Sequence, residues 1–266
     1  MSLSLYNVTS MRRTDGDLEA IDPYLAMVKD AAERFFGHPG VEDEPFGFIW
    51  DIVGDVPISR GLGSSVTLRL GIMGGLNEMC SSPLSREELF ELCTAAEGHP
   101  DNAGPGAFGG FVLANRNGDS FRFEVPDELD TVLLIPDFEV QTDPSREALP
   151  VHIPHTDAVL NIGNACTIAA AFATGEMDKL KGTFEDRLHQ PYRKHLIPGL
   201  YDIIDAGVRA GALGGFLSGS GSTIACLTNK GNGDDIATAM RTAHPGTGGK
   251  SKTLIVKADN GGIQVL

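Results

Sequence analysis

The sequence has no run of about 18 consecutive apolar residues, which a membrane-spanning helix needs. The N-terminus also lacks the apolar stretch of a signal peptide, so we expect a cytoplasmic protein. Cysteine is scarce, and no CxxC or mixed His/Cys spacing suggests structural zinc. Each cysteine lies among apolar residues, so we expect small buried thiols at Cys80, Cys93, Cys166 and Cys226.

Positive charge is also in deficit. The chain carries 21 Lys and Arg against 36 Asp and Glu, for a formal net charge of −15. Nucleic acids and anionic membrane surfaces both require clustered cations, so the balance argues against either as a partner. ATP is not excluded, because local N–H groups and a metal ion can offset the overall field.

The 266 residues, 41% of them hydrophobic, can form one large domain or two closely packed ones. Apolar periodicity and turn residues predict helices at 22–36, 64–77, 85–97, 157–173, 196–210 and 234–243. The same reasoning predicts strands at 4–13, 46–53, 109–115, 119–125, 131–136, 213–217, 223–227 and 252–256. These elements do not alternate as βαβ units, which favours a two-domain α+β protein over a doubly wound sheet. A composition change near 126–129 suggests domains at 1–127 and 128–266.

The segment 57–65 (PISRGLGSS) leads from a predicted strand through a glycine-rich loop into an apolar helix. Glycines allow a ligand to approach the backbone closely, and the first N–H groups of a helix have no partners within it. The helix dipole adds partial positive charge, so the loop suggests a phosphate site. It matches neither the Walker A nor the GxGxxG pattern, and an ordinary strand-to-helix turn is an equally good interpretation. A second candidate at 248–251 (GGKS) is rejected, because it leads toward a strand.

Two further clusters carry polar or small residues. The segment 97–102 (EGHPDN) stands at a predicted helix end, where a carboxylate near a phosphate loop can hold Mg²⁺. Taken alone, a capped helix end followed by a solvated loop is the better interpretation, with a turn at 104–106. The segment 214–223 (GGFLSGSGST) is either a tight hairpin or a backbone edge that approaches a bound ligand.

In this order, the three clusters resemble the motifs of the GHMP small-molecule kinases, and within them those of the homoserine kinases. Segments 132–138 (VLLIPDF), 186–193 (DRLHQPYR) and 196–199 (LIPG) are similar to the second domain of that family. The resemblance covers nearly the whole chain. It implies a ribosomal-protein-S5-like N-terminal domain and a ferredoxin-like C-terminal domain.

The resemblance further implies ATP-dependent phosphorylation of L-homoserine to O-phospho-L-homoserine, on the route to threonine. Mg²⁺ would be held by Ser65 and Glu97, which with Arg193 form the implied catalytic set. The implied nucleotide-binding residues are Pro57, Ile58, Ser59, Arg60, Gly61, Leu62, Gly63, Ser64, Ser65, Val66 and Thr67, with main-chain N–H groups from Gly61 to Ser65 around the phosphates. The implied substrate residues are His99, Asp101, Asn102, Arg193, Gly219 and Gly221. Dimers are common in the family, so a second copy of the chain is an expected partner.

One departure from the family pattern bears on activity. The first motif of the family, Pro-x-x-x-Asn-Leu-Gly-Pro-Gly-Phe-Asp, is absent, and its loss is expected to remove a strand and expose a sheet edge. Two alternatives therefore stay open. The chain could be an inactive homologue that keeps a nucleotide or amino-acid pocket, or a GHMP kinase that acts on another small hydroxyl substrate.

Overall fold

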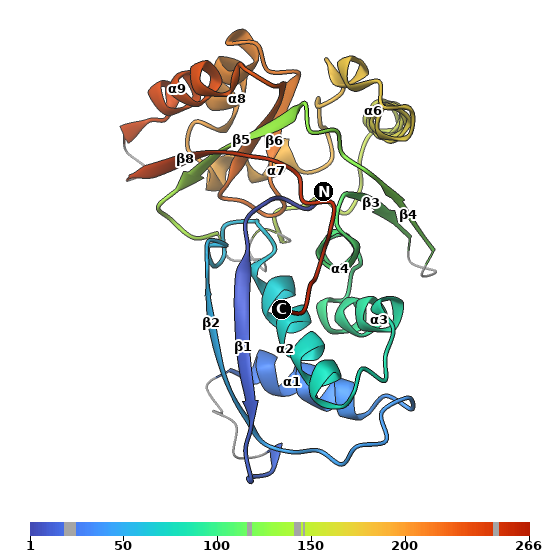
Figure 1. Cartoon of the computed structure of the whole chain (residues 1–266). Helices are drawn as coiled ribbons and strands as arrows, with labels where there is room; N and C mark the ends of the chain where they lie inside the picture. The colour runs from blue at the N-terminus through green and yellow to red at the C-terminus, as the bar shows by residue number, and fades with distance from the viewer. Residues whose placement is uncertain (19–24, 116–118, 141–144, 146, 247–249) are drawn as a thin grey trace. The chain divides into compact units, whose positions relative to one another are not determined.

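The computed structural model describes all residues except 19–24, 116–118, 141–144, 146 and 247–249 (Figure 1). The chain forms two compact units. The first unit comprises residues 1–56, 63–123 and 259–266, and the second comprises 57–62 and 124–258. The division into 1–127 and 128–266 stays a prediction, because these units are defined by contacts and each takes segments from both sides of that boundary. No helix in the described part of the chain has the length and hydropathy to cross a membrane.

The described residues of the first unit form two antiparallel strand pairs and four helices. Its elements are β1 (Asn7–Arg13), α1 (Ala26–Phe36), β2 (Phe48–Gly54), α2 (Ser64–Met79), α3 (Arg86–Glu97), α4 (Ala103–Phe108), β3 (Phe111–Ala114) and β4 (Ser120–Phe123). Strand β1 pairs with β2, and β3 pairs with β4. Residues 116–118, between the strands expected at 109–115 and 119–125, lie outside the described residues, as does the expected start of the first helix.

Helix α2 lies against strand β1, and its glycines make this possible. A Cβ atom at Gly71 would lie 2.2 Å from the Thr9 hydroxyl, and one at Gly75 would lie 2.4 Å from the Met11 sulfur. The same helix contributes fully buried side chains such as Ile72 to the core. The glycine interruptions in this helix therefore mark close packing against a strand.

The second unit contains a four-stranded antiparallel sheet. Its elements are β5 (Leu129–Pro136), α6 (His155–Thr174), the 3-10 helix η2 (Met177–Leu180), α7 (Gln190–Arg193), the 3-10 helix η3 (Lys194–Leu196), α8 (Leu200–Arg209), β6 (Gly214–Leu217), β7 (Ile224–Asn229), α9 (Gly233–Ala243) and β8 (Ser251–Val256). The strand order is β6-β7-β5-β8, with α8 and α9 packed on the sheet. In chain order the sheet and these helices form a β-α-β-β-α-β unit, which confirms the ferredoxin-like expectation.

Three local predictions are wrong. Residues 103–108 form α4 and not a solvated turn, because Gly104 and Gly106 let this short helix pack closely on Val112 and Val66. The helix expected over 196–210 begins only at Leu200, after Gly199 with a φ of 76°. Cys166 is exposed, whereas the other three thiols are buried as expected.

Candidate active site

The start of α2 has the features of an anion site. Its N-cap residue is Gly63, which has a φ of 73° and offers no side-chain cap to the helix. Gly63 belongs to the first unit, whereas the preceding residues 57–62 belong to the second. The side chains of Val66 and Thr67 have structural partners: Val66 is buried, and Thr67 Oγ1 donates to the Ser64 carbonyl at 2.9 Å. A nucleotide-binding role for these two residues stays a prediction.

Ser65 and Glu97 lie together in the first unit. The Ser65 hydroxyl donates to Oε2 of Glu97 at 2.9 Å, although 32 positions separate them in the chain. Glu97 is the last residue of α3, and only 9% of its side chain is exposed. Helix α3 begins with a capping box, in which Ser85 and Glu88 bond reciprocally. The structure thus joins a hydroxyl and a carboxylate at the start of α2.

The other oxygen of Glu97 is also bound. Arg69 Nε donates to Glu97 Oε1 at 2.9 Å, and the same guanidinium bonds to Asp30 of α1. Burial alone would raise the pKa of Asp30, but hydrogen bonds from Arg69 and Arg34 outweigh it and hold the pKa below its usual value. Sequence reasoning missed Arg69 and Asp30. The available signal was the position of Arg69, the one cation in α2, four residues after Ser65 and so on the same helix face.

The donor set at this place suits Mg²⁺. Among the described residues, no three His, Cys, Asp or Glu side chains gather in a group that could hold a metal ion. A hydroxyl and a carboxylate are oxygen ligands, and Mg²⁺ in phosphate-transfer sites is held by few protein oxygens together with substrate phosphates. Ser65 and Glu97 fit that pattern.

His99, Asp101 and Asn102 follow directly after α3. The helix ends at Gly98, whose φ is 80°, and His99 Nδ1 hydrogen bonds to the carboxylate of Asp101. Asn102 is the N-cap residue of α4 and makes no side-chain cap bond. The Asp101 side chain is 73% exposed and the His99 side chain 31%. All three residues thus belong to one short connection in the first unit.

In the second unit, the β6–β7 hairpin supports residues 57–62. The Ser218 hydroxyl donates to the Gly61 carbonyl at 2.7 Å, and the Thr223 N–H donates to the Arg60 carbonyl at 3.1 Å. Gly61 has a φ of 73°, and a Cβ atom there would lie 2.1 Å from the Ser218 carbonyl oxygen. The hairpin interpretation of 214–223 is therefore right, and the hairpin also fixes the glycine loop. Within that loop, Arg60 is paired with Glu139 at 3.5 Å.

The segment before α7 is organised by Asp186. Its carboxylate accepts the N–H groups of Leu188, His189 and Gln190. Burial would raise the pKa of Asp186, but the backbone hydrogen bonds from Gln190 and His189 are decisive and lower it. Gln190 in turn accepts the Leu217 N–H at 2.8 Å, which ties α7 to the sheet.

Arg193 ends α7 and is buried. Its Nε donates to the Ser145 carbonyl at 3.0 Å, and its Nη1 donates to the Gly219 carbonyl at 3.2 Å. Burial lowers the pKa of the neighbouring His189, and Arg193 lowers it further against the influence of Asp186. Arg193 and Gly219 are thus brought together within the second unit. Arg187, six residues earlier in the chain, pairs with Glu185 at the surface.

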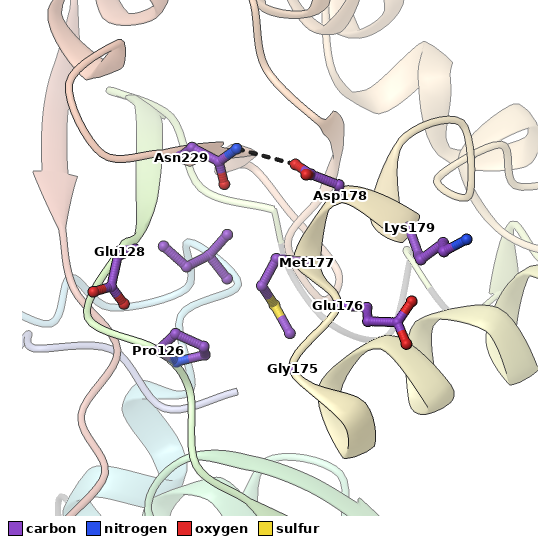
Figure 2. Close-up of a pocket in the computed structure, with 9 residues that line it drawn as sticks. Pro126, Glu128, Gly175, Glu176, Met177, Asp178, Lys179 and Asn229 are labelled. Atoms are coloured by element: carbon purple, nitrogen blue, oxygen red, sulfur yellow. Dashed lines mark hydrogen bonds between the residues drawn. The ribbon is translucent and has the colours of Figure 1, made fainter.

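A cavity of about 500 Å³ lies elsewhere in the second unit (Figure 2). Its lining residues are Pro126, Glu128, Leu129, Gly175, Glu176, Met177, Asp178, Lys179 and Asn229. Asn229 donates to Asp178 at 3.2 Å at its edge. None of the candidate site residues predicted from the sequence lines it, so this cavity is separate from the predicted site residues.

Comparison with known proteins gives consistent matches. The model of the GHMP kinases N terminal domain matches residues 26–110, and that of the GHMP kinases C terminal domain matches residues 168–246. A homoserine kinase of Caldicellulosiruptor saccharolyticus is 36% identical over 280 residues, covering 100% of this chain and 90% of the relative. A homoserine kinase of Clostridium kluyveri is 33% identical over 276 residues, covering 100% and 92%. The solved homoserine kinase of Cytophaga hutchinsonii superposes with a TM-score of 0.85 at 25% identity, over 96% of this chain and 86% of that one.

Proposed function

The chain belongs to the homoserine kinases of the GHMP kinase family, and from this premise we propose that it transfers the γ-phosphoryl group of ATP to the hydroxyl group of L-homoserine. The two-domain α+β fold of that family is present. The observation that supports catalysis most directly is the hydrogen bond between Ser65 and Glu97 at the start of α2. In this proposal, the two bonded oxygens would be ligands for Mg²⁺, next to the helix end that would bind the phosphates.

The proposed mechanism relies on positioning and charge neutralisation. Main-chain N–H groups at the start of α2 would bind the phosphates, and Ser65 and Glu97 would hold Mg²⁺. The metal supplies positive charge that neutralises the phosphate oxygens. The substrate oxygen forms a bond to the γ-phosphorus in line with the breaking bond to ADP, with no covalent enzyme intermediate. No side chain of the site is an obvious strong base, so the hydroxyl proton passes late to a phosphate oxygen.

Substrate recognition is proposed for residues of each unit separately. His99, Asp101 and Asn102 in the first unit offer acceptors and donors suited to the ammonium and hydroxyl groups of an amino acid. Arg193 in the second unit suits a carboxylate, because its planar fork can bind two oxygens at once. Its bonds to two carbonyls fix the plane of that fork. Gly219, whose carbonyl accepts from Arg193, and Gly221, two residues further along the chain, are assigned to the same substrate site.

The decisive experiment is a coupled ADP-release assay with a panel of hydroxyl substrates. We expect Mg²⁺-dependent ADP release with L-homoserine, and none above background with mevalonate or galactose. Phosphate transfer to the substrate is checked by mass spectrometry of the product. Turnover of mevalonate or galactose, with no turnover of homoserine, would assign the chain to another substrate within the GHMP kinases. Calorimetric ligand binding without any turnover would support the inactive homologue instead.

We also propose that two copies of the chain associate through helix α6. Between Ala158 and Thr174 this helix carries no charged residue, and it exposes Val159 and Ile162 by 56% and 62%. Cys166 lies on the same helix and is exposed. In a chain of net charge −15, an uncharged apolar face is where a second copy meets least repulsion. The cytoplasmic location stays a prediction.

The association is tested by light scattering after size-exclusion chromatography. The wild-type chain is expected at twice the mass of one copy, and Ile162→Lys is expected at the mass of one. Val208→Lys, on an exposed position of α8, is the matched control and should leave the mass unchanged. A wild-type chain that runs as a single copy, or an Ile162→Lys variant that stays paired, would rule out α6 as the interface.

A further inference from the structure

Arg69 is an unusual residue for its place in the chain. It lies inside the apolar helix α2, and only 12% of its side chain is exposed. A guanidinium that is nearly removed from water needs anionic partners, since burial of an unpaired charge is strongly unfavourable. Its position four residues after Ser65 puts it on the same face of the helix, one turn further along.

The partners of Arg69 lie on two other helices. Its Nε donates to Glu97 Oε1 at 2.9 Å at the end of α3, and its Nη1 donates to Asp30 on α1. Asp30 is held in turn by Arg34 Nε at 2.8 Å. The guanidinium therefore bridges α1 and α3, and the position of the Glu97 carboxylate is tied to both helices.

The two oxygens of Glu97 are consequently divided between two partners. Oε1 accepts from Arg69 and Oε2 accepts from Ser65, both at 2.9 Å. A carboxylate with one oxygen bound in this way cannot rotate that oxygen toward the hydroxyl. Only the second oxygen faces Ser65.

We propose that Arg69 is a positioning residue for phosphoryl transfer, which holds Glu97 by one oxygen so that the other stays beside the Ser65 hydroxyl for Mg²⁺. The inference rests on the proposed function and adds a residue to it. Lysine cannot replace arginine in this role, because one ammonium group lacks the planar fork that reaches two carboxylates on different helices.

A competing effect has the opposite sign. A cation beside a metal site repels the metal, so removal of Arg69 by itself would strengthen Mg²⁺ binding. The charge of Arg69 is offset, however, by the carboxylates of Glu97 and Asp30, both of which it contacts. Loss of the Glu97 orientation should therefore dominate when Arg69 is removed. The sign of the change in Mg²⁺ binding separates the two effects, because relief of repulsion strengthens binding and loss of orientation weakens it.

The test measures metal-dependent nucleotide binding without turnover. Calorimetry gives the affinity of the purified chain for a non-hydrolysable ATP analogue, once with Mg²⁺ and once with EDTA. The ratio of these two affinities is the gain due to the metal. We expect this gain to fall about tenfold or more in Arg69→Met and Arg69→Lys, as for other residues that orient a metal ligand. Arg34→Met is the matched control, because Arg34 contacts the same Asp30 but not Glu97. It should keep the wild-type gain.

Each other outcome overturns the inference. A larger gain in Arg69→Met means that Arg69 acts on the metal mainly by repulsion. An unchanged gain means that Arg69 has no effect on the metal. A wild-type gain in Arg69→Lys removes the need for the fork, and an equal loss in Arg34→Met shows general destabilisation. Thermal melting identifies a variant that does not fold, and Arg69→Lys, which keeps the charge, then carries the test. If Mg²⁺ does not raise the affinity of the wild-type chain for the ATP analogue, the proposed function itself has failed. This result is seen before any variant is compared.

Discussion

Glu97→Gln is expected to reduce Mg²⁺-dependent phosphoryl transfer by at least about a hundredfold, the size of effect seen when one electrostatic group of an active site is lost. The substitution keeps the shape of the side chain and removes its negative charge. The amide cannot neutralise a divalent ion, and it offers only one oxygen for Ser65 and Arg69 to share. Steady-state ADP release at saturating ATP and homoserine measures the loss.

The fold should survive this substitution. Arg69 loses one anionic partner but keeps Asp30, so the free energy of unfolding should fall by less than the roughly 3–5 kcal/mol of a broken buried pair. Glu91→Gln, at an exposed position of the same helix α3, is the control and should keep wild-type activity. If Glu97→Gln turns over at the wild-type rate, Glu97 does not hold the metal.

Gly61→Ala is expected to be the most destabilising of the small substitutions in the glycine loop. The added Cβ would lie 2.1 Å from the Ser218 carbonyl oxygen, at a φ of 73°. The loop would have to move away from the hairpin, which also breaks the hydrogen bond from the Ser218 hydroxyl. We expect the free energy of unfolding to fall by about 3 kcal/mol or more, from backbone strain together with overpacking.

Gly63→Ala is the matched control, because Gly63 has the same φ of 73° but no atom within 4 Å of the added Cβ. Only the backbone strain remains there, about 1–2 kcal/mol. Urea unfolding of both variants measures the difference. Both glycines belong to the proposed phosphate loop, so activity cannot separate them and stability can. Equal losses in the two variants would show that the contact between Gly61 and Ser218 is unimportant.

Local patterns predicted most of the regular structure. Apolar segments bounded by turn residues located α3 and all four strands of the ferredoxin-like sheet. The errors fall where local preference and packing disagree. Gly104 is a poor helix residue, yet it lies in α4, where a Cβ atom would come within 2.8 Å of the Val112 side chain.

The exposure of Cys166 shows a second limit. Its apolar neighbours in the sequence predict burial, but burial depends on what covers the helix in space. Helix α6 buries only Ala171 and Phe172 within the described structure. Apolar composition alone therefore could not distinguish a core helix from one with an uncovered face.

Glu97 and Ser65 could be named from their motifs, since residue types and order along the chain carry that information. Their partners could not. Arg69 meets Glu97 across 28 positions and Asp30 across 39, and Gly61 meets Ser218 across 157. The amino-acid order alone was enough to identify the family and most of the elements, and it predicts a phosphate-binding role for the loop. Only the packing of distant segments decided which oxygen of Glu97 each neighbour binds and which glycine cannot accept a side chain. Hydrogen bonds and steric contacts act over a few ångströms in space, whatever the separation along the chain.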